Sequence, residues 1–390
     1  AELRASARSL KKKKRERAAA PSAVADAPPT SEHVDAAPSL SSFSELSLSM
    51  PLLKALHEVG WEKPTPIQAA VIPVALLGRD ICGSAVTGSG KTAAFLLPIL
   101  ERLAYRRRHV SSTRVLILTP TRELAAQCET VGRRLAAFLG GRFALVVGGL
   151  SPQTQEAELR TRPDVIVATP GRIIDLVRNS LSVGLDDVEI LVLDEADRLL
   201  DLGFRAEVDE IVRTCPRERQ TLLFSATISE EVAELANASL REPIQLKVDP
   251  LYNVAEKLRQ EFVHVKSDRE HEREALLLCL VTRVFKARTV IFLPSKKLAH
   301  RVRILFGLNS LRVAELHGNM TQLQRMHALE SFTNGSADFL VATDLAGRGL
   351  DIPAVESVIN YELPANMKTY VHRVGRTARA GRGGCAVSFV

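Results

Sequence analysis

The amino-acid sequence predicts an α/β protein of two tandem domains, each a mostly parallel sheet flanked by helices, joined by a short linker. Three observations support this prediction. The chain has 390 residues, which is too long for one ordinary domain and suits two domains of medium size. Short apolar runs alternate with amphipathic segments, as in parallel sheets that helices cover on both faces. This alternation stops once, at residues 249–257, and then starts again.

The first stretch of alternation predicts residues 42–248 as one domain. Its buried strands are expected at Ile81–Ala85, Val115–Thr119, Phe143–Val147, Val165–Ala168, Ile190–Leu193 and Thr221–Phe224. Amphipathic helices are expected between them, for example at Thr121–Leu139 and Glu230–Leu240. The stretch Asp249–Ala255 contains a proline and breaks the pattern, so residues 249–257 are predicted as the linker.

Residues 258–390 are predicted as the second domain. Its strands are expected at Phe262–Val265, Val290–Leu293, Val313–Glu315, Phe339–Ala342 and Val358–Asn360. Its helices are expected at Glu272–Val284, Lys296–Phe306 and Gln322–Phe332. The chain begins at Ala1 rather than Met and stops at Val390 within an expected late strand, so we expect a piece of a longer protein, with its second domain truncated.

Composition argues against a membrane protein and against a disulfide-stabilised domain. Hydrophobic residues make up 46% and charged residues 25%, as in soluble globular proteins. No stretch approaches the roughly 18 consecutive apolar residues that a membrane-spanning helix needs, and no secretory signal follows the basic start. The five cysteines are scattered singly, which argues against a zinc site and indicates a reducing compartment.

Net charge points to a polyanionic partner. The chain carries +7 at pH 7, of which residues 1–41 contribute +3 from eight basic and five acidic residues. This segment is rich in Ala, Ser and Pro and has no aromatic residue, so a disordered tail is predicted. Its run Lys11–Arg15 fits a nuclear address, an RNA-contacting arm or a merely solvated charge run.

The segment Ala85–Thr92, Ala-Val-Thr-Gly-Ser-Gly-Lys-Thr, predicts a phosphate-binding loop because it follows a strand and opens a helix. Glycines let backbone N–H groups converge on phosphate oxygens, Lys91 neutralises phosphate charge, and Thr92 offers a hydroxyl to Mg²⁺. Ala85 stands where the strict pattern has its first Gly. The predicted nucleotide contacts here are Thr87, Gly88, Ser89, Gly90, Lys91 and Thr92.

An acidic cluster follows the expected strand Ile190–Leu193. A carboxylate at the carboxyl end of a buried strand is where a nucleotide-binding α/β fold places its metal ligand. We therefore expect Asp194 to hold Mg²⁺, and Glu195 to orient the attacking water as a base. Together with the phosphate loop, this cluster predicts hydrolysis of a nucleoside triphosphate with Mg²⁺, with Lys91 among the catalytic residues.

The motifs and their order resemble those of the DEAD-box ATP-dependent RNA helicases over about nine tenths of the chain, from Phe43 almost to its end. The resemblance implies two tandem RecA-like domains. Gly60–Gln68 is similar to the family's Q motif, which implies that Gln68 reads the edge of adenine and that Phe43 stacks on the base. A glutamine amide can both donate to and accept from that edge.

Three further segments of the first domain, Pro120–Ala125, Gly148–Gly149 and Thr169–Arg172, match the family's RNA-contacting segments and offer hydroxyls, helix-start amides and arginines. The implied RNA contacts are Pro120, Thr121, Arg122, Gly149, Thr169 and Arg172. Ser225-Ala226-Thr227 resembles the segment that couples ATP hydrolysis to strand separation, which implies coupling roles for Ser225 and Thr227.

In the second domain the resemblance implies contacts with both RNA and ATP. The implied RNA contacts are Gln322, Arg325 and Thr343, and the implied ribose contacts are Gly349 and Asp351. In His372–Arg382 the family's pattern implies a coupling role for His372 and arginine fingers at Arg376 and Arg379. Leu293-Pro294 replaces the family's usual polar pair, and His317 is assigned no chemical role.

The resemblance implies an RNA-dependent ATPase and helicase that bends the RNA backbone and opens short duplexes locally. The sequences of the phosphate loop and of His372–Arg379 resemble those of the nucleolar branch of the family, which assists large ribosomal subunit assembly. This resemblance implies pre-ribosomal RNA and ribosome-assembly proteins as partners. It also implies a location in the nucleus, in the nucleolus. Two alternatives remain open from the sequence: a DNA-directed helicase of the same architecture, and an ATP-gated RNA clamp with little turnover.

Overall fold

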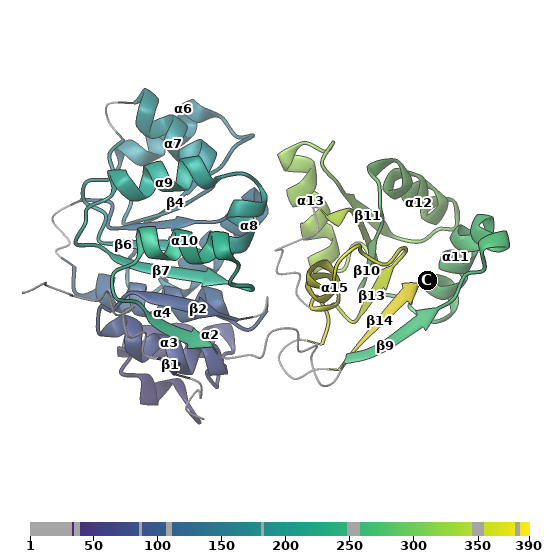
Figure 1. Cartoon of the computed structure of the whole chain (residues 1–390), viewed down its shortest axis with the longest axis horizontal. Coiled ribbons are helices and arrows are strands. Elements are labelled where there is room, and N and C mark those ends of the chain that lie inside the picture. Colours follow the sequence, from purple (N-terminus) through teal and green to yellow (C-terminus); the bar gives the residue numbers. More distant parts are fainter. Residues whose placement is uncertain are drawn as a thin grey trace, which may run out of the picture. The chain divides into compact units, whose positions relative to one another are not determined.

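The computed structural model describes residues 33–34, 40–85, 88–106, 111–180, 183–247, 258–344, 355–378 and 383–390. The predicted linker 249–257 lies outside the described residues, as does most of the predicted tail 1–41. Two parallel sheets with flanking helices are present, so the predicted fold class is confirmed (Figure 1). Among the described residues, no helix is both long and apolar enough to cross a membrane.

The first sheet has eight strands, all parallel, in the order β1-β8-β2-β7-β6-β3-β5-β4. Its strands are β1 (His33–Val34), β2 (Ile81–Ser84), β3 (Val115–Leu118), β4 (Phe143–Val146), β5 (Val165–Ala168), β6 (Ile190–Leu193), β7 (Gln220–Ser225) and β8 (Ile244–Lys247). The six strands predicted for this domain are all present, with their ends moved by at most one residue.

Helices cover both faces of this sheet (Figure 1). They are η1 (Phe43–Leu46), α2 (Met50–Val59), α3 (Pro66–Leu76), α4 (Lys91–Ala104), α5 (Arg122–Leu135), α6 (Pro152–Arg160), α7 (Pro170–Asn179), α8 (Ala196–Asp201), α9 (Arg205–Thr214) and α10 (Glu230–Ser239). Alternate residues of β3 enter different cores: Val115 and Ile117 pack with α2–α5, whereas Leu116 and Leu118 pack with α6–α10. Such burial on both faces explains why these strands are continuous apolar runs.

Two strands of the first sheet were not predicted. β8 lies between β1 and β2 and alternates apolar and polar residues, so it lacks the continuous apolar run of the central strands. β1 has only two residues, too few to show any periodicity, and falls within the tail that was expected to be disordered. The expected helix Thr121–Leu139 was also too long, because α5 ends at Leu135.

The second sheet has six parallel strands in the order β11-β12-β10-β13-β14-β9. Its elements are β9 (Leu258–Val263), η2 (Ser267–Glu272), α11 (Arg273–Arg283), β10 (Thr289–Phe292), α12 (Lys296–Leu308), β11 (Val313–Leu316), α13 (Gln322–Thr333), β12 (Phe339–Ala342), β13 (Ser357–Asn360), α15 (Met367–Val374) and β14 (Gly384–Phe389). β9 begins four residues before the expected Phe262 because it is a largely exposed edge strand, whose polar residues hide it from a search for apolar runs.

Candidate active site

The segment that we predict to bind phosphate lies between β2 and the start of α4. Gly90 has φ +95°, and a Cβ atom there would lie 2.5 Å from Nε2 of Gln68, so this position requires glycine. The Lys91 ammonium is buried and donates to the carbonyl oxygen of Ala85 at 2.9 Å. The Ser89 hydroxyl is buried without a hydrogen-bond partner. An ammonium and an unsatisfied hydroxyl in a glycine loop at a helix start form a cradle suited to phosphate. Of the predicted contacts in this loop, Thr87 lies outside the described residues.

The predicted adenine-reading glutamine is held against this loop. The Gln68 carbonyl oxygen accepts from the Thr65 backbone N–H at 2.9 Å, and its amide nitrogen donates to the Gly90 carbonyl at 3.1 Å. Both ends of the amide therefore have protein partners. Phe43, the predicted stacking aromatic, is 3% exposed and belongs to the same hydrophobic core as residues of α2 and α3. The adenine contacts of Gln68 and Phe43 remain predictions.

Asp194 follows β6 directly and is 3% exposed. Burial, together with the neighbouring charge of Glu195, raises the pKa of Asp194 to about 7, although Lys91 acts in the opposite direction. A buried carboxylate whose charge is only partly compensated is a site that favours a cation. Asp194 and the Thr92 hydroxyl at the start of α4 are therefore suited to holding Mg²⁺. No trio of His, Cys, Asp or Glu side chains suited to a metal occurs in the described part of the chain.

Glu195 sits at the turn from β6 into α8 with φ +50°, a backbone conformation uncommon for a residue with a side chain. Its carboxylate accepts from the Arg198 guanidinium at 2.8 Å, and both side chains are at most 6% exposed. Burial alone would raise the pKa of Glu195, but Arg198, Lys91 and Arg376 together lower it. The predicted base is thus held ionised. Sequence reasoning missed Arg198, although it directly follows the acidic cluster.

The predicted coupling segment is hydrogen-bonded to the acidic cluster. The Thr227 hydroxyl donates to the Asp197 carboxylate at 2.8 Å, and the Asp197 backbone N–H donates to the Ser225 hydroxyl at 3.3 Å. The Ser225 hydroxyl donates in turn to the Thr227 carbonyl at 2.7 Å. A displacement of this segment would therefore pull on the loop that holds Asp194 and Glu195. Asp197 itself was not among the predicted site residues.

The end of helix α15 and the residues that directly follow it hold the described part of the predicted arginine-finger segment. Arg376, just after α15, is 1% exposed, and its charge lowers the pKa of Glu195, so it lies near the acidic cluster. Burial and the neighbouring Arg376 lower the pKa of His372 to about 4, which keeps this imidazole neutral at physiological pH. The other three predicted ATP-contacting residues of this domain, Arg379, Gly349 and Asp351, lie outside the described residues.

The predicted RNA contacts of the first domain gather at the carboxyl ends of β3, β4 and β5. Arg122 lies against the backbone of Gly148, where a Cβ atom would be 2.9 Å from its guanidinium. Thr121 uses its hydroxyl to cap α5, accepting from the Leu124 N–H at 3.3 Å. Arg172 donates to the Leu150 carbonyl at 3.2 Å. The other three predicted contacts of this domain, Pro120, Gly149 and Thr169, occupy the same strand ends.

The predicted RNA contacts of the second domain lie near those of the first. A Cβ atom at Gly149 would be 3.3 Å from Cβ of Gln322, the first residue of α13. The Arg325 guanidinium lies 3.0 Å from the carboxylate of Glu123 in α5, and that carboxylate is almost fully buried. Thr343 directly follows β12 and is half-buried. The structure thus brings Arg122, Gly149, Gln322 and Arg325 together, and Glu123 joins them as a residue the sequence analysis did not assign.

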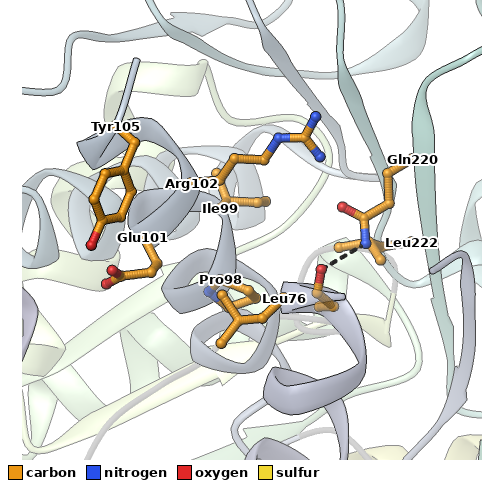
Figure 2. A pocket seen from close by; sticks show the side chains of 9 residues that line it. Leu76, Pro98, Ile99, Glu101, Arg102, Tyr105, Gln220 and Leu222 are labelled. Atoms are coloured by element: carbon orange, nitrogen blue, oxygen red, sulfur yellow. Dashed lines mark hydrogen bonds between the residues drawn. The ribbon is translucent and has the colours of Figure 1, made fainter. Parts of the chain in front are cut away.

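A separate pocket of about 230 Å³ lies elsewhere in the first domain (Figure 2). It is lined by the second half of α4, the end of α3 and the start of β7, where the Gln220 amide donates to the Ala75 carbonyl at 3.0 Å. Gln220 begins β7, whereas the phosphate loop follows the carboxyl end of the neighbouring strand β2. The pocket is therefore remote from the phosphate loop, and no predicted site residue lines it.

Two family models match the chain. The model described as "DEAD/DEAH box helicase" matches residues 65–235, and the model described as "Helicase conserved C-terminal domain" matches residues 271–381. A solved structure described as "S. cerevisiae Dbp5 bound to RNA and ADP BeF3" is 31% identical, with a TM-score of 0.79, and the match covers 90% of both chains. The chain belongs to the DEAD-box helicase family. Its two tandem α/β domains are accordingly RecA-like.

Some longer proteins have a higher sequence identity to this chain than the Dbp5 structure has. "DEAD-box ATP-dependent RNA helicase 28" of Oryza sativa subsp. japonica is 58% identical over 349 residues, which is 90% of this chain and 44% of the relative. "ATP-dependent RNA helicase drs1" of Schizosaccharomyces pombe is 53% identical over 349 residues, which is 90% of this chain and 46% of the relative. The chain therefore spans less than half the length of these curated relatives.

Proposed function

We propose that this DEAD-box chain is the catalytic module of an ATP-dependent RNA helicase. The observation that carries the proposal is the environment of Glu195. This buried carboxylate is held ionised by Arg198 of its own helix, by Lys91 of the phosphate loop and by Arg376 of the second domain. An ionised carboxylate beside a phosphate-binding lysine and an arginine is the arrangement needed to activate water against a phosphoryl group.

ATP would bind with its phosphates at the loop ending in Lys91 and Thr92. Thr92 and Asp194 would hold Mg²⁺, which when bound supplies positive charge to the phosphate oxygens. Glu195 orients and deprotonates the attacking water, and Arg376 stabilises the charge that develops on the phosphate. The second finger, Arg379, and the ribose contacts Gly349 and Asp351 are proposed from the sequence pattern alone.

Single-stranded RNA is the proposed polymer because the gathered residues suit a sugar–phosphate backbone. Arg122, Arg172 and Arg325 supply positive charge, and they lie among glycines and helix starts rather than among base-stacking aromatics. Residues 258–390 hold nineteen Lys and Arg against twelve Asp and Glu, so the second domain carries an excess of positive charge. The Dbp5 structure that this chain resembles was solved bound to RNA.

Coupling would run through the segment Ser225–Thr227 because it is hydrogen-bonded to Asp197 of the acidic cluster. A change at the phosphate end of the site is thereby transmitted to a strand end of the first domain. The proposed output is bending of one RNA strand, which disfavours its pairing and opens a short duplex locally. His372 would join this coupling as a neutral hydrogen-bonding group, since its pKa of about 4 prevents it from carrying charge at neutral pH.

The test is ATP hydrolysis with and without single-stranded RNA, repeated with single-stranded DNA, for the wild type and for Glu195→Gln. We expect stimulation by RNA alone, and a loss of at least about 10²-fold in the variant, as for removal of a positioned general base. Glu218→Gln replaces an exposed carboxylate of the same domain and should leave the rate unchanged. Equal stimulation by DNA would favour a DNA-directed enzyme, and tight nucleotide-dependent RNA binding without turnover would favour a clamp.

We further propose a role in pre-ribosomal RNA processing within the nucleolus. The support is the resemblance of the phosphate loop and of His372–Arg379 to the nucleolar branch, together with the basic run Lys11–Arg15. Crosslinking of the full-length protein to RNA in cells, followed by sequencing, tests this role directly. Recovery of pre-ribosomal RNA from the nucleolus is expected; recovery mainly of messenger RNA from the cytoplasm would overturn it.

A further inference from the structure

Two strands of the second sheet end in buried polar residues that no motif explains. Asn360 closes β13 and Ser388 lies near the end of β14, and both are 0% exposed among otherwise apolar neighbours. The two are register partners across the parallel pair, and Nδ2 of Asn360 donates to the Ser388 hydroxyl at 2.9 Å. Buried polar groups of this kind cost stability unless they are satisfied, so their partners indicate their role.

On one side this pair continues to the segment after β12. The Asn360 side-chain oxygen accepts from the Arg373 guanidinium at 3.2 Å, and Arg373 donates two further hydrogen bonds to Asp344, at 2.6 and 2.7 Å. Arg373 is 5% exposed and lies over the ring of Phe292 in the adjacent strand β10. A forked, charge-assisted contact of this geometry fixes Asp344 firmly. Asp344 directly follows Thr343, the proposed RNA contact.

On the other side the pair continues to the first strand after the predicted linker. Ser388 also interacts with Tyr370 in α15: it lowers the pKa of the Tyr370 hydroxyl, against the larger effect of burial, which raises it. Tyr370 is 8% exposed and also donates to the Gln260 side chain of β9 at 2.7 Å. Its ring stacks on that of Phe262, with centroids 6.3 Å apart. A continuous network of polar side chains therefore runs from β9 through α15, β14 and β13 to Asp344.

The network of polar side chains follows one row of residues across the sheet. Phe292 pairs in register with Asn360, Asn360 with Ser388, and Ser388 with Phe262, so the row crosses β10, β13, β14 and β9 in the order of the strands (Figure 1). Helix α15 contributes Tyr370 and Arg373 to the network, three residues apart and therefore on one helix face. Arg376 lies one further step of three along the chain, near the acidic cluster.

We propose that Asn360, Ser388 and Tyr370 are positioning residues, which lock helix α15 to the segment Thr343–Asp344 so that the arginine finger and the RNA contact move as one rigid unit. The inference rests on the proposed function for its catalytic consequence, but not for the physical link itself. Without the lock, Arg376 and Thr343 could each reach its partner, but no longer at the same time. Catalysis that depends on RNA should then suffer more than the binding of either ligand.

The test compares Ser388→Ala, which removes one oxygen from the network, with Ser357→Ala. Ser357 is a buried serine at the other end of β13, outside the network, and so provides a matched control. Amide hydrogen exchange of the nucleotide-free protein measures the link. We expect about tenfold faster exchange both in α15 and at Thr343–Asp344 in Ser388→Ala, and no change there in Ser357→Ala. Faster exchange confined to β14 would overturn the proposal.

Steady-state kinetics measure the catalytic consequence. Ser388→Ala and Tyr370→Phe should each lower the RNA-stimulated kcat about three- to tenfold, while the KM for ATP and the midpoint of RNA binding stay within about twofold. A fall in affinity with kcat unchanged would contradict a positioning role. If the wild type shows no RNA-stimulated hydrolysis, the proposed helicase function fails, whereas the exchange measurement still decides whether the lock exists.

Discussion

Replacing Arg198 by methionine should make ATP hydrolysis sensitive to acid. In the wild type Arg198 is bonded to Glu195 at 2.8 Å, and both side chains are at most 6% exposed, so solvent screens the pair little. Burial raises the pKa of Glu195, and Arg198 contributes the largest opposing effect, with Lys91 and Arg376 adding to it. Without Arg198 the pKa of Glu195 rises. The carboxylate is then protonated as the pH falls, and an active base is lost.

Removing one partner of a buried ion pair costs about 3–5 kcal/mol. Because Lys91 and Arg376 still act on Glu195, we expect the ionised form of Glu195 to lose about 2–3 kcal/mol of stabilisation in this variant. At a pH below the new pKa, this loss corresponds to a roughly 30- to 150-fold smaller ionised fraction. The expected result is therefore a large loss of kcat at acidic pH that shrinks as the pH rises. Methionine fills a similar volume, so the loss should not reflect a cavity.

The assay is RNA-stimulated ATP hydrolysis at saturating ligands between about pH 5.5 and 9. Arg198→Lys keeps the positive charge but not the guanidinium group, and should raise the pH at which the rate falls by less than Arg198→Met does. Arg205→Met removes a half-exposed partner of Asp209 in the neighbouring helix α9 and should leave the profile unchanged. A loss in Arg198→Met of equal size at every pH would refute the reasoning, because it would show that Arg198 does not act through the ionisation of Glu195.

Three further predictions follow from the same site. Gly90→Ala should cost about 2–4 kcal/mol of unfolding free energy and abolish nucleotide binding, because φ is +95° and the new methyl group would meet the Gln68 amide; urea unfolding and nucleotide titration check this. Since the pKa of Asp194 is about 7, the KM for Mg-ATP should fall up to about tenfold from pH 6 to pH 8 as the carboxylate ionises; a flat KM would contradict the assignment. Thr227→Val breaks the bond to Asp197 and should reduce duplex opening at least about tenfold while RNA-stimulated hydrolysis stays within about threefold, measured in parallel.

The central parts of the fold were predictable because they follow simple rules. Strands buried on both faces are unbroken apolar runs, so β3, β5 and β6 could be located almost to the residue. Edge strands break these rules: β9 is mostly exposed and polar, and β8 alternates. Their position depends on backbone pairing with a neighbour, which local sequence does not record.

The predicted site residues shared one property, a position in a recognisable motif. The residues that the sequence analysis missed either lie outside every motif or occupy motif positions to which it assigned no role. Arg198 follows the acidic cluster directly, yet its importance arises from burial next to Glu195, which only the three-dimensional structure shows. Glu123 lies inside a matched segment but became significant only through Arg325, some two hundred residues away. Asn360 and Ser388 carry the one available signal, a polar residue at the end of a buried apolar strand.

The electrostatics of Glu195 explain why hydrolysis can depend on the state of the whole molecule. Its carboxylate is buried, so ionisation is unfavourable unless nearby cations compensate for lost water. Those cations come from three separate places: α8, the phosphate loop and the end of α15. Arg198 lies one turn from Glu195 in α8, whereas Lys91 belongs to the proposed phosphate-binding loop and Arg376 to the other domain. The proposed base has a charge that depends on contributions from both domains, so we expect it to be fully competent only when both are in place. The proposed polar lock on α15 would make that placement depend on the proposed RNA contact at Thr343.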